Sequence, residues 1–225
     1  MQIEPTHYNL PSGYTHIYSG KVRDLYEVDE HHMLMVASDR LSAFDVVMNE
    51  TIPHKGRVLT ALTDYWLTLL PDVPRALISC DPTVIATYVP GFLAADEWHG
   101  RTMLVRRAEM LPLECIVRAR LAGQAFDEYQ VSGTVHGMSA PAGLSLTDPF
   151  PTPWFTPSTK ADTGHDVNIS RDAAVTLVGA DTVTEIEAFC CELFERAAAA
   201  MSAVGLVLAD TKFEVGFVDG RLVVC

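Results

Sequence analysis

The sequence has no long apolar run and no excess of positive charge. None of its hydrophobic stretches reaches the roughly 20 residues that span a bilayer, and the polar start Met1-Gln2-Ile3-Glu4-Pro5 lacks the apolar core of a signal peptide. With 16 Lys and Arg against 29 Asp and Glu, the formal net charge is −13, which opposes binding to nucleic-acid phosphates. We therefore expect a cytoplasmic protein with no membrane and no nucleic-acid partner.

Cysteine is also scarce. The five cysteines, including the adjacent Cys190 and Cys191, show no metal-ligand spacing. An odd number suits reduced thiols in a core better than a disulfide framework. What the chain does have is 225 residues, 48% of them hydrophobic, which is enough to bury a full core as one large domain or two small lobes.

Alternating hydrophobicity predicts strands in several parts of the chain. The first two runs flank the polar turn Asp29-Glu30-His31, and Asp219-Gly220 is a hairpin signal before residues 221–225. The strand-like runs are residues 22–28, 33–37, 102–108, 113–117, 206–210 and 212–217.

Helical periodicity appears twice between these strands, so the expected fold class is α+β. The first helix begins at Gly56 and ends before Pro71. The second is expected to open with a capping box, Thr182 with Glu185, and to stop at Gly205. Residues 132–157 are rich in Gly, Pro, Ser and Thr without clear periodicity, which predicts a long surface excursion of the kind that closes over sites.

The first polar cluster is Ser19-Gly20-Lys21-Val22-Arg23-Asp24. A glycine permits close approach of backbone N–H groups to a phosphate. Lys21 and Arg23 are alternate residues of an expected strand, so both would point to one face and meet a polyphosphate. The cluster is not the GxxxxGK[ST] loop, and by itself the pattern is more typical of a hairpin with solvated cations.

The second cluster, Ser38-Asp39-Arg40-Leu41-Ser42-Ala43-Phe44-Asp45, ends a hydrophobic strand with five polar side chains. That density is expected where a strand delivers groups into a cleft. An arginine between two aspartates can grip a substrate carboxylate or phosphate, while the carboxylates bind an amine or a metal. The structural alternative is a capped turn that holds its own ion pairs.

The third cluster is Asp210-Thr211-Lys212-Phe213-Glu214. Its period of 2 places Asp210, Lys212 and Glu214 on one face of a strand. Two carboxylates around a lysine can hold Mg²⁺ through oxygen and neutralise a transferring phosphoryl group. A solvent-facing charged ladder has the same pattern, but the preceding apolar residues 206–208 favour a buried strand that delivers its charges into a pocket.

Together these clusters resemble the phosphoribosylaminoimidazole-succinocarboxamide synthase (SAICAR synthetase) family, and the resemblance covers almost the entire chain. The matching stretches occur in the family's order and are therefore specific as a set. They are residues 19–26, 36–45, 52–57, 110–118, 155–160, 164–166 and 210–216.

The resemblance implies both a fold and a reaction. The fold is α+β, with an antiparallel β lobe over residues 1–110 that is similar to the small lobe of protein kinases, a larger α+β lobe over residues 111–225, and ATP in the cleft between them. The reaction is an ATP-dependent ligation of carboxyaminoimidazole ribotide to L-aspartate. Because a carboxylate has a poor leaving group, it is first activated as an acyl phosphate and then attacked by the amine.

The resemblance also implies roles for individual residues. Asp210, Lys212 and Glu214 would be catalytic, and the carboxylates of Asp210 and Glu214 would hold Mg²⁺. Family members commonly associate, and residues 57–70 offer a candidate face for self-association. The residues that match the ATP site are Gly20, Lys21, Val22 and Arg23, with Arg107 and Met110 near the adenine.

The substrate residues implied by the resemblance come from several loops. Arg118 matches the family arginine that holds the ribotide phosphate. The other matches line the imidazole and aspartate sites without individual contacts being assigned. The full set is Ser38, Asp39, Arg40, Ser42, Asp45, Lys55, Arg118, Gln124, Lys160, His165 and Asp166.

The sequence departs from the family pattern at a few positions. Gln124 stands where relatives have a phosphate-gripping serine, Val167 where they have a glutamate, and Asp127 where they have a lysine. The sequence stops at Cys225, before an Asp-Glu pair and a Pro-Asp-x-x-Arg segment that supply relatives with a metal-binding Asp and a second phosphate-gripping Arg. These departures leave two alternatives to the purine-pathway ligase: a paralogous amide ligase of specialised metabolism, and a non-catalytic nucleotide-binding protein.

Overall fold

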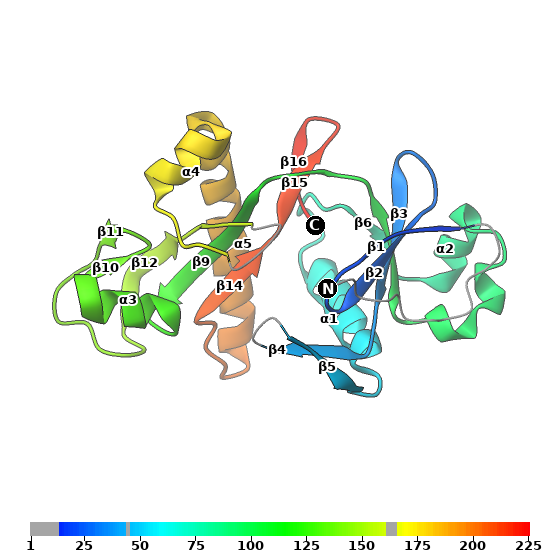
Figure 1. Ribbon diagram of the computed structural model, residues 1–225, viewed down its shortest axis with the longest axis horizontal. Helices are drawn as coiled ribbons and strands as arrows, with labels where there is room; N and C mark the ends of the chain where they lie inside the picture. The colour runs from blue at the N-terminus through cyan, green and yellow to red at the C-terminus, as the bar shows by residue number, and fades with distance from the viewer. Residues whose placement is uncertain (1–13, 44–45, 161–165) are drawn as a thin grey trace. The chain divides into compact units, whose positions relative to one another are not determined.

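The computed structural model describes residues 14–43, 46–160 and 166–225. The chain divides into two compact units, Met1–Ala108 and Glu109–Cys225. Each unit combines antiparallel strands with helices (Figure 1), so the expected α+β class is confirmed. Within the described residues, no helix is long and apolar enough to cross a membrane.

The first unit is built on an antiparallel sheet with the strand order β1-β2-β3-β7-β6. The strands predicted at residues 22–28, 33–37 and 102–108 are confirmed, and the first two pair across the predicted polar turn. The sheet consists of β1 (Thr15–Ser19), β2 (Arg23–Glu27), β3 (His32–Ala37), β6 (Leu77–Ser79) and β7 (Thr102–Arg106).

The core of the first unit lies between this sheet and short helical segments. Tyr26 and Leu34 of the sheet pack with Phe92 and Trp98, and the rings of Tyr26 and Trp98 lie 4.9 Å apart. Burying such large apolar side chains is the main stabilising term for a small unit. The segments are α2 (Pro82–Tyr88) and the single 3₁₀ turns η1 (Phe92–Ala94) and η2 (Asp96–Trp98).

Helix α1 (Lys55–Leu69) is confirmed where the sequence predicts it and packs on the end of β3. Gly56 is required at this crossing, because a Cβ there would overlap the backbone carbonyl of Ala37. The chain reaches α1 through the hairpin of β4 (Arg40–Ala43) and β5 (Val46–Thr51). The segment that follows β3 is thereby fixed against the start of the helix.

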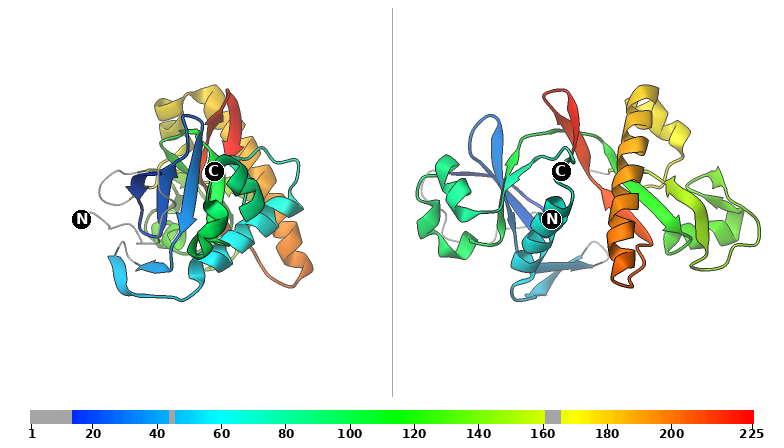
Figure 2. Two further views of the ribbon diagram at one scale, coloured as in Figure 1. Left: turned by 90° about the vertical axis from the view of Figure 1, so that its right-hand side faces the viewer. Right: turned by 180° about the vertical axis from the view of Figure 1, so that it is seen from behind.

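The second unit is organised around the long strand β9 (Leu113–Arg120). β12 (Pro149–Phe155), β13 (Ser158–Thr159) and β14 (Asp210–Phe213) all pair with it antiparallel. Helix α5 (Ala180–Ala203), with α4 (Arg171–Val178) beside it, covers one face of this sheet (Figure 2). The free thiols Cys115 and Cys190 are buried in the core between them, as expected, whereas Cys225 is exposed.

A β-hairpin completes this unit at the C-terminal end of the sequence. β15 (Val215–Val218) pairs with β16 (Arg221–Val224) and also with the short β8 (Glu109–Met110). Asp219 and Gly220 have φ values of 52° and 73°, the left-handed pair that a two-residue hairpin turn needs, so the predicted turn is confirmed.

Residues 132–157 are more ordered than the sequence predicts. They contain β12 and the hairpin of β10 (Thr134–Val135) and β11 (Met138–Ser139), next to helix α3 (Gln124–Ser132). Val135 and Phe150 pack against Leu121 and Ala125 in a small core of their own. The segment was not predicted to hold strands because β10 and β11 have only two residues each and β12 contains three prolines, so none of them shows the alternation that indicates a strand.

Two further local predictions are wrong. Helix α5 begins at Ala180 rather than at Thr182, and its N-cap is Gly179 with no side-chain cap bond. Gly179, at φ 92°, lets the chain pass directly from α4 into α5, so the capping box is not used. Residues 206–208 form no strand, and Leu206 and Val207 are exposed. Pairing with β9 begins only at Asp210, opposite Arg118.

Candidate active-site residues

The first polar cluster forms the tight connection between β1 and β2. The backbone N–H of Gly20 donates to the carbonyl of Arg23 at 2.7 Å and closes the turn. Lys21 lies in this turn, and the strand begins only at Arg23. The expectation that both cations alternate along one strand is therefore wrong, although both side chains are exposed.

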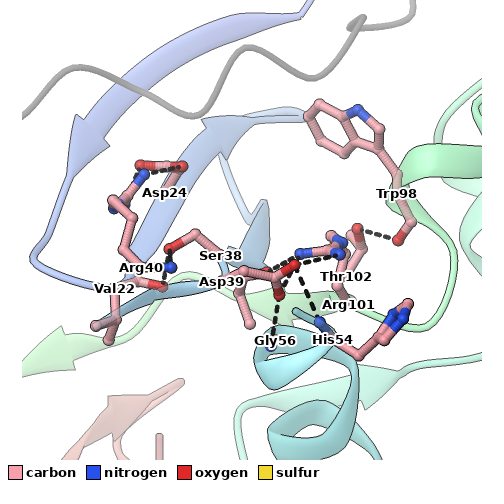
Figure 3. Close-up of polar contacts among 11 residues, drawn as sticks. Val22, Asp24, Ser38, Asp39, Arg40, His54, Gly56, Trp98, Arg101 and Thr102 are labelled. Carbon is pink, nitrogen blue, oxygen red and sulfur yellow. Dashed lines mark hydrogen bonds and ion pairs between the residues drawn. The ribbon is translucent and has the colours of Figure 1, made fainter. Parts of the chain in front are cut away.

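Arg40 binds the inner side of this turn. Its guanidinium donates to both carboxylate oxygens of the fully buried Asp24, at 2.8 and 3.1 Å (Figure 3). It also donates to the carbonyls of Gly20 and Lys21, at 3.1 and 3.2 Å. A bidentate pair with two further carbonyl contacts fixes the shape of the turn. These contacts give Arg40 a structural role in the first unit. For Arg40 they favour the alternative of a capped turn that holds its own ion pairs over a substrate grip.

Asp39 joins the end of β3 to the start of α1. Its carboxylate accepts hydrogen bonds from the Arg101 guanidinium at 3.1 and 3.3 Å and from the backbone N–H groups of His54 and Gly56 at 3.2 and 2.9 Å (Figure 3). Burial raises the pKa of Asp39, but the bonds from Arg101 and Gly56 outweigh it and leave the pKa below its ordinary value. Asp39 thus caps α1 from another segment.

The remaining described residues predicted in this cluster, Ser38 and Ser42, carry hydroxyl groups rather than charges. The Ser38 hydroxyl donates to the carbonyl of Val22 at 2.8 Å. Ser42 is half-buried and pairs with Val47 in the β4–β5 hairpin. Asp45 lies outside the described residues. The polar density of the cluster therefore serves mainly to connect the turn, the sheet and α1.

A group of cations lies close to the start of α1. The pKa of Lys55 is lowered by burial first and then by the positive charge of Arg23, with a smaller effect of the same sign from Arg40; Asp39 acts in the opposite direction. Cations that raise one another's energy favour an anionic ligand. This part of the first unit therefore fits phosphate groups.

The second unit carries a ladder of ion pairs on one face of its sheet. Each pair joins residues far apart in sequence, and each includes one residue of the segment 210–214. The pairs are Arg118–Asp210 at 2.5 Å, Lys212–Glu114 at 2.5 Å and Lys160–Glu214 at 2.6 Å.

The pairing of β9 with β14 explains the ladder. Asp210 lies opposite Arg118 and Lys212 opposite Ile116, so alternate residues of both strands share a face. Glu114 belongs to the same row, is nearly buried, and also accepts a hydrogen bond from the Ser158 hydroxyl at 3.2 Å. The sequence reasoning assigned no role to Glu114, although its spacing of four from Arg118 was visible.

The other predicted site residues are dispersed. Gln124 is the exposed first residue of α3, and Asp166 is exposed in the loop before α4. Arg107 donates to Glu27 at 3.4 Å in the first unit, whereas Met110 is exposed on β8 of the second. Arg118 is buried, and this burial lowers its pKa while Asp210 raises it. His165 lies outside the described residues.

The carboxylates of the ladder are the candidate ligands for a divalent cation. Among the described residues, no group of three or more His, Cys, Asp and Glu side chains is arranged so that it could hold a metal ion. Mg²⁺ in phosphoryl-transfer sites is commonly held by one or two carboxylates plus substrate phosphates. Asp210 and Glu214 lie four residues apart along one extended segment and pair with different cations, so each carboxylate separately fits a Mg²⁺ that is held together with substrate phosphates.

The α+β fold, the cations near the start of α1 and the ladder of ion pairs fit a ligase that handles phosphorylated substrates. A family model described as SAICAR synthetase matches residues 16–225. The chain belongs to the SAICAR synthetase family.

Individual relatives agree with this assignment. The phosphoribosylaminoimidazole-succinocarboxamide synthase of Syntrophotalea carbinolica is 48% identical over 210 residues, which are 90% of this chain and 68% of that protein. The enzyme of the same name from Cyberlindnera jadinii is 45% identical over 206 residues, 89% of this chain and 68% of that protein. The chain thus spans about two thirds of the length of these relatives.

Solved structures show the same fold. The SAICAR synthase of Saccharomyces cerevisiae, solved with SAICAR, matches with a TM-score of 0.88 at 38% identity over 97% of this chain and 74% of that one. A SAICAR synthetase solved with ADP matches with a TM-score of 0.72 at 23% identity, over 92% of this chain and 78% of that one.

Proposed function

We propose that this chain forms an amide between the carboxylate of carboxyaminoimidazole ribotide and the amine of L-aspartate at the expense of ATP, giving SAICAR, ADP and phosphate. Membership of the family supports the reaction type. The observation that carries the proposal is the ladder, in which Asp210 and Lys212 of β14 share one face of the sheet with Arg118 and Glu114 of β9, and Glu214 follows directly after β14. It brings metal-binding carboxylates and phosphate-binding cations together.

The ladder suits the charge changes of such a reaction. ATP supplies the phosphoryl group that converts the carboxylate into an acyl phosphate, and phosphate leaves when the amine attacks. Lys212 offsets negative charge that develops on the transferring group. The carboxylates of Asp210 and Glu214 would each hold Mg²⁺ together with ATP phosphates, and the bound ion would neutralise phosphate charge. Arg118 holds the phosphate of the ribotide by charge-assisted hydrogen bonds.

The first unit supplies the other anion-binding groups in this proposal. The exposed Lys21 and Arg23, on the turn that Arg40 fixes, contact the ATP phosphates. Arg107 and Met110 are assigned to adenine, as the family resemblance implies, and Lys55 adds positive charge. Ser38, Asp39 and Arg40 act by shaping the site. The neighbour solved with ADP shares this fold. In this chain, the cations around Lys55 support the binding of nucleotide phosphates.

The remaining substrate residues belong to the second unit. Lys160 donates to Glu214 at 2.6 Å and is the third cation of the ladder. Gln124 and Asp166, with Asp45 and His165, are assigned to the ribotide and aspartate. Self-association also stays a prediction; the exposed apolar side chains of α1, which include Leu62 and Tyr65, are the surface on which substitutions would test it.

An omission assay tests the reaction. ADP release is measured with Mg-ATP, carboxyaminoimidazole ribotide and L-aspartate, with each left out in turn, and the product is identified by mass. We expect release that requires all three substrates and a product with the mass of SAICAR. ADP release that continues without the ribotide, or an amide formed only with another carboxylate, would contradict the proposal and favour a paralogous ligase.

A further inference from the structure

His136 occupies an unusual position in the second unit. It is the first residue of the two-residue turn between β10 and β11, where its φ is 49° and that of Gly137 is 72°. Left-handed backbone is uncommon for residues other than glycine. Nevertheless the histidine ring points inward and is 1% exposed. A hairpin turn usually presents its side chains to solvent, so this burial calls for a reason.

Glu128 of α3 holds this turn in place. Its carboxylate accepts hydrogen bonds from the backbone N–H groups of His136 and Gly137, at 3.0 and 2.9 Å, and from the Thr134 hydroxyl at 2.8 Å. Burial raises the pKa of Glu128, but the hydrogen bonds from Gly137 and Thr134 outweigh this effect and leave the pKa below its ordinary value. The carboxylate therefore stays ionised. Consecutive N–H groups of left-handed residues form a cradle for an anion, and Glu128 fills it.

The hydrogen bonding of His136 defines its tautomer. Nδ1 lies 2.8 Å from the carbonyl oxygen of Pro157, which can only accept, so Nδ1 carries the proton. Burial lowers the pKa of His136; the Pro157 carbonyl and Glu128 raise it, and Arg118 lowers it. The ring is therefore neutral, and Nε2 is a hydrogen-bond acceptor. Nε2 is buried and has no partner within the described residues.

Arg118 presents the complementary group. Its Nη1 donates to Asp210, but its Nε–H is buried and also lacks a partner in the described part of the chain. Arg118 and His136 are close enough to interact electrostatically. A buried donor and a buried acceptor without partners, on side chains that interact electrostatically, can satisfy one another through a bridging water.

We propose that His136 is a positioning residue for Arg118: its Nε2, through one bridging water, holds the Nε–H of Arg118 and so aims the guanidinium at the phosphate of the ribotide. The inference rests on the proposed function, because that function assigns the phosphate to Arg118. This positioning role explains why a histidine ring is buried at a left-handed turn, and why Glu128 stabilises that turn. ATP binding is independent of this contact.

His136→Asn separates this role from a structural one. Asparagine tolerates the left-handed region, and its amide N–H replaces Nδ1–H as the donor to Pro157. It places no acceptor where Nε2 lies. The matched control is His31→Asn, because the His31 side chain is exposed and belongs to the first unit.

The binding of carboxyaminoimidazole ribotide and of ATP is measured by calorimetry for the wild type and both asparagine variants. Loss of one hydrogen bond should weaken ribotide binding by about threefold to tenfold in His136→Asn, with the ATP affinity and the melting temperature unchanged. In an Arg118→Ala background, His136→Asn should have no further effect on ribotide binding. Equal ribotide affinity in wild type and His136→Asn would overturn the inference, and so would equal losses for ATP and ribotide or losses that add in the Arg118→Ala background.

A readout without substrate separates this inference from the proposed function. The Nε–H of Arg118, assigned by its disappearance in Arg118→Lys, should exchange slowly with solvent in the wild type and at least tenfold faster in His136→Asn. Equal exchange rates would overturn the positioning role even in an active enzyme. If the ribotide binds but no SAICAR forms, the proposed function fails while the affinities still decide the inference; a wild type that binds no ribotide contradicts both.

Discussion

The two units use the same charged residue types in opposite ways. In the first, Asp24 is fully buried under Arg40, and the Arg101 side chain that holds Asp39 is 6% exposed. In the second, the side chains of Asp210 and Lys212 are 43% and 50% exposed, although each has a close partner. Ion pairs closed off from water define a shape, whereas half-exposed pairs can exchange their partners for a ligand. Burial and hydrogen-bond saturation, rather than residue type, separate scaffold from site.

Arg40→Met should break the buried ion pair with Asp24 in the first unit and have the largest effect on stability. It leaves the Asp24 carboxylate buried without its bidentate partner, which typically costs about 3–5 kcal/mol. Urea unfolding would measure the loss. Arg23→Met, which removes an exposed cation from the same turn, is the control and should change stability by less than about 0.5 kcal/mol.

The double variant Asp24→Asn/Arg40→Met sharpens this test, because it removes both charges. It should be more stable than Arg40→Met alone, since no buried charge remains unpaired. If Arg40→Met unfolds at the wild-type urea concentration but loses ribotide binding, Arg40 is a substrate residue and the comparison between the two units fails.

Glu214→Gln should have the opposite signature in the second unit. The change preserves size and removes one charge of a half-exposed pair, so the free energy of unfolding should change by at most about 1 kcal/mol. We expect kcat to fall about 10²–10³-fold, because a group that acts on transition-state charge is lost. Glu192→Gln, in the exposed pair with Arg196 on α5, is the matched control. Unchanged kcat in Glu214→Gln would show that the ladder only stabilises the sheet.

Local patterns predicted the elements whose cause is local. The Asp219-Gly220 turn and the strands β2, β3 and β7 follow from neighbouring residues, and the structure confirms them. The start of α5 was missed because the N-cap of the helix is Gly179, a residue outside the expected capping box. Propensity therefore located elements better than it located their ends.

The charged clusters show more clearly what local sequence patterns cannot predict. Asp39 and Arg101 are separated by 62 residues and Lys212 and Glu114 by 98, so no local pattern reveals that they pair. The sequence could identify residues 38–45 as unusual but could not decide between a substrate grip and a capped turn. His136 was missed because a lone histidine next to a glycine carries no motif, and only its burial and its open Nε2 mark it.

Arg23→Ala should have an intermediate effect that appears only with nucleotide. Arg23 is exposed at the start of β2, and a charge-assisted hydrogen bond to a phosphate contributes about 1.5–3 kcal/mol. We therefore expect the KM for ATP to rise about tenfold to a hundredfold while the melting temperature stays constant. Arg221→Ala, also an exposed cation at the start of a strand, is the control. An unchanged KM for ATP would mean that the nucleotide is placed wrongly.

The smallest expected effect is a pH dependence that the second unit owes to His136. Its pKa in the folded protein is lowered by burial, with Arg118 acting in the same direction and the Pro157 carbonyl and Glu128 opposing. The unfolded chain binds a proton at the ordinary value of about 6.5, so stability is fully present above that pH and is lost as the pH falls toward the folded-state pKa. The slope from this one group is at most about 1.4 kcal/mol per pH unit. Urea unfolding between pH 7.5 and 5 should therefore give a shallower slope for His136→Asn than for the wild type, and parallel curves would show that the ring is not kept neutral by the fold.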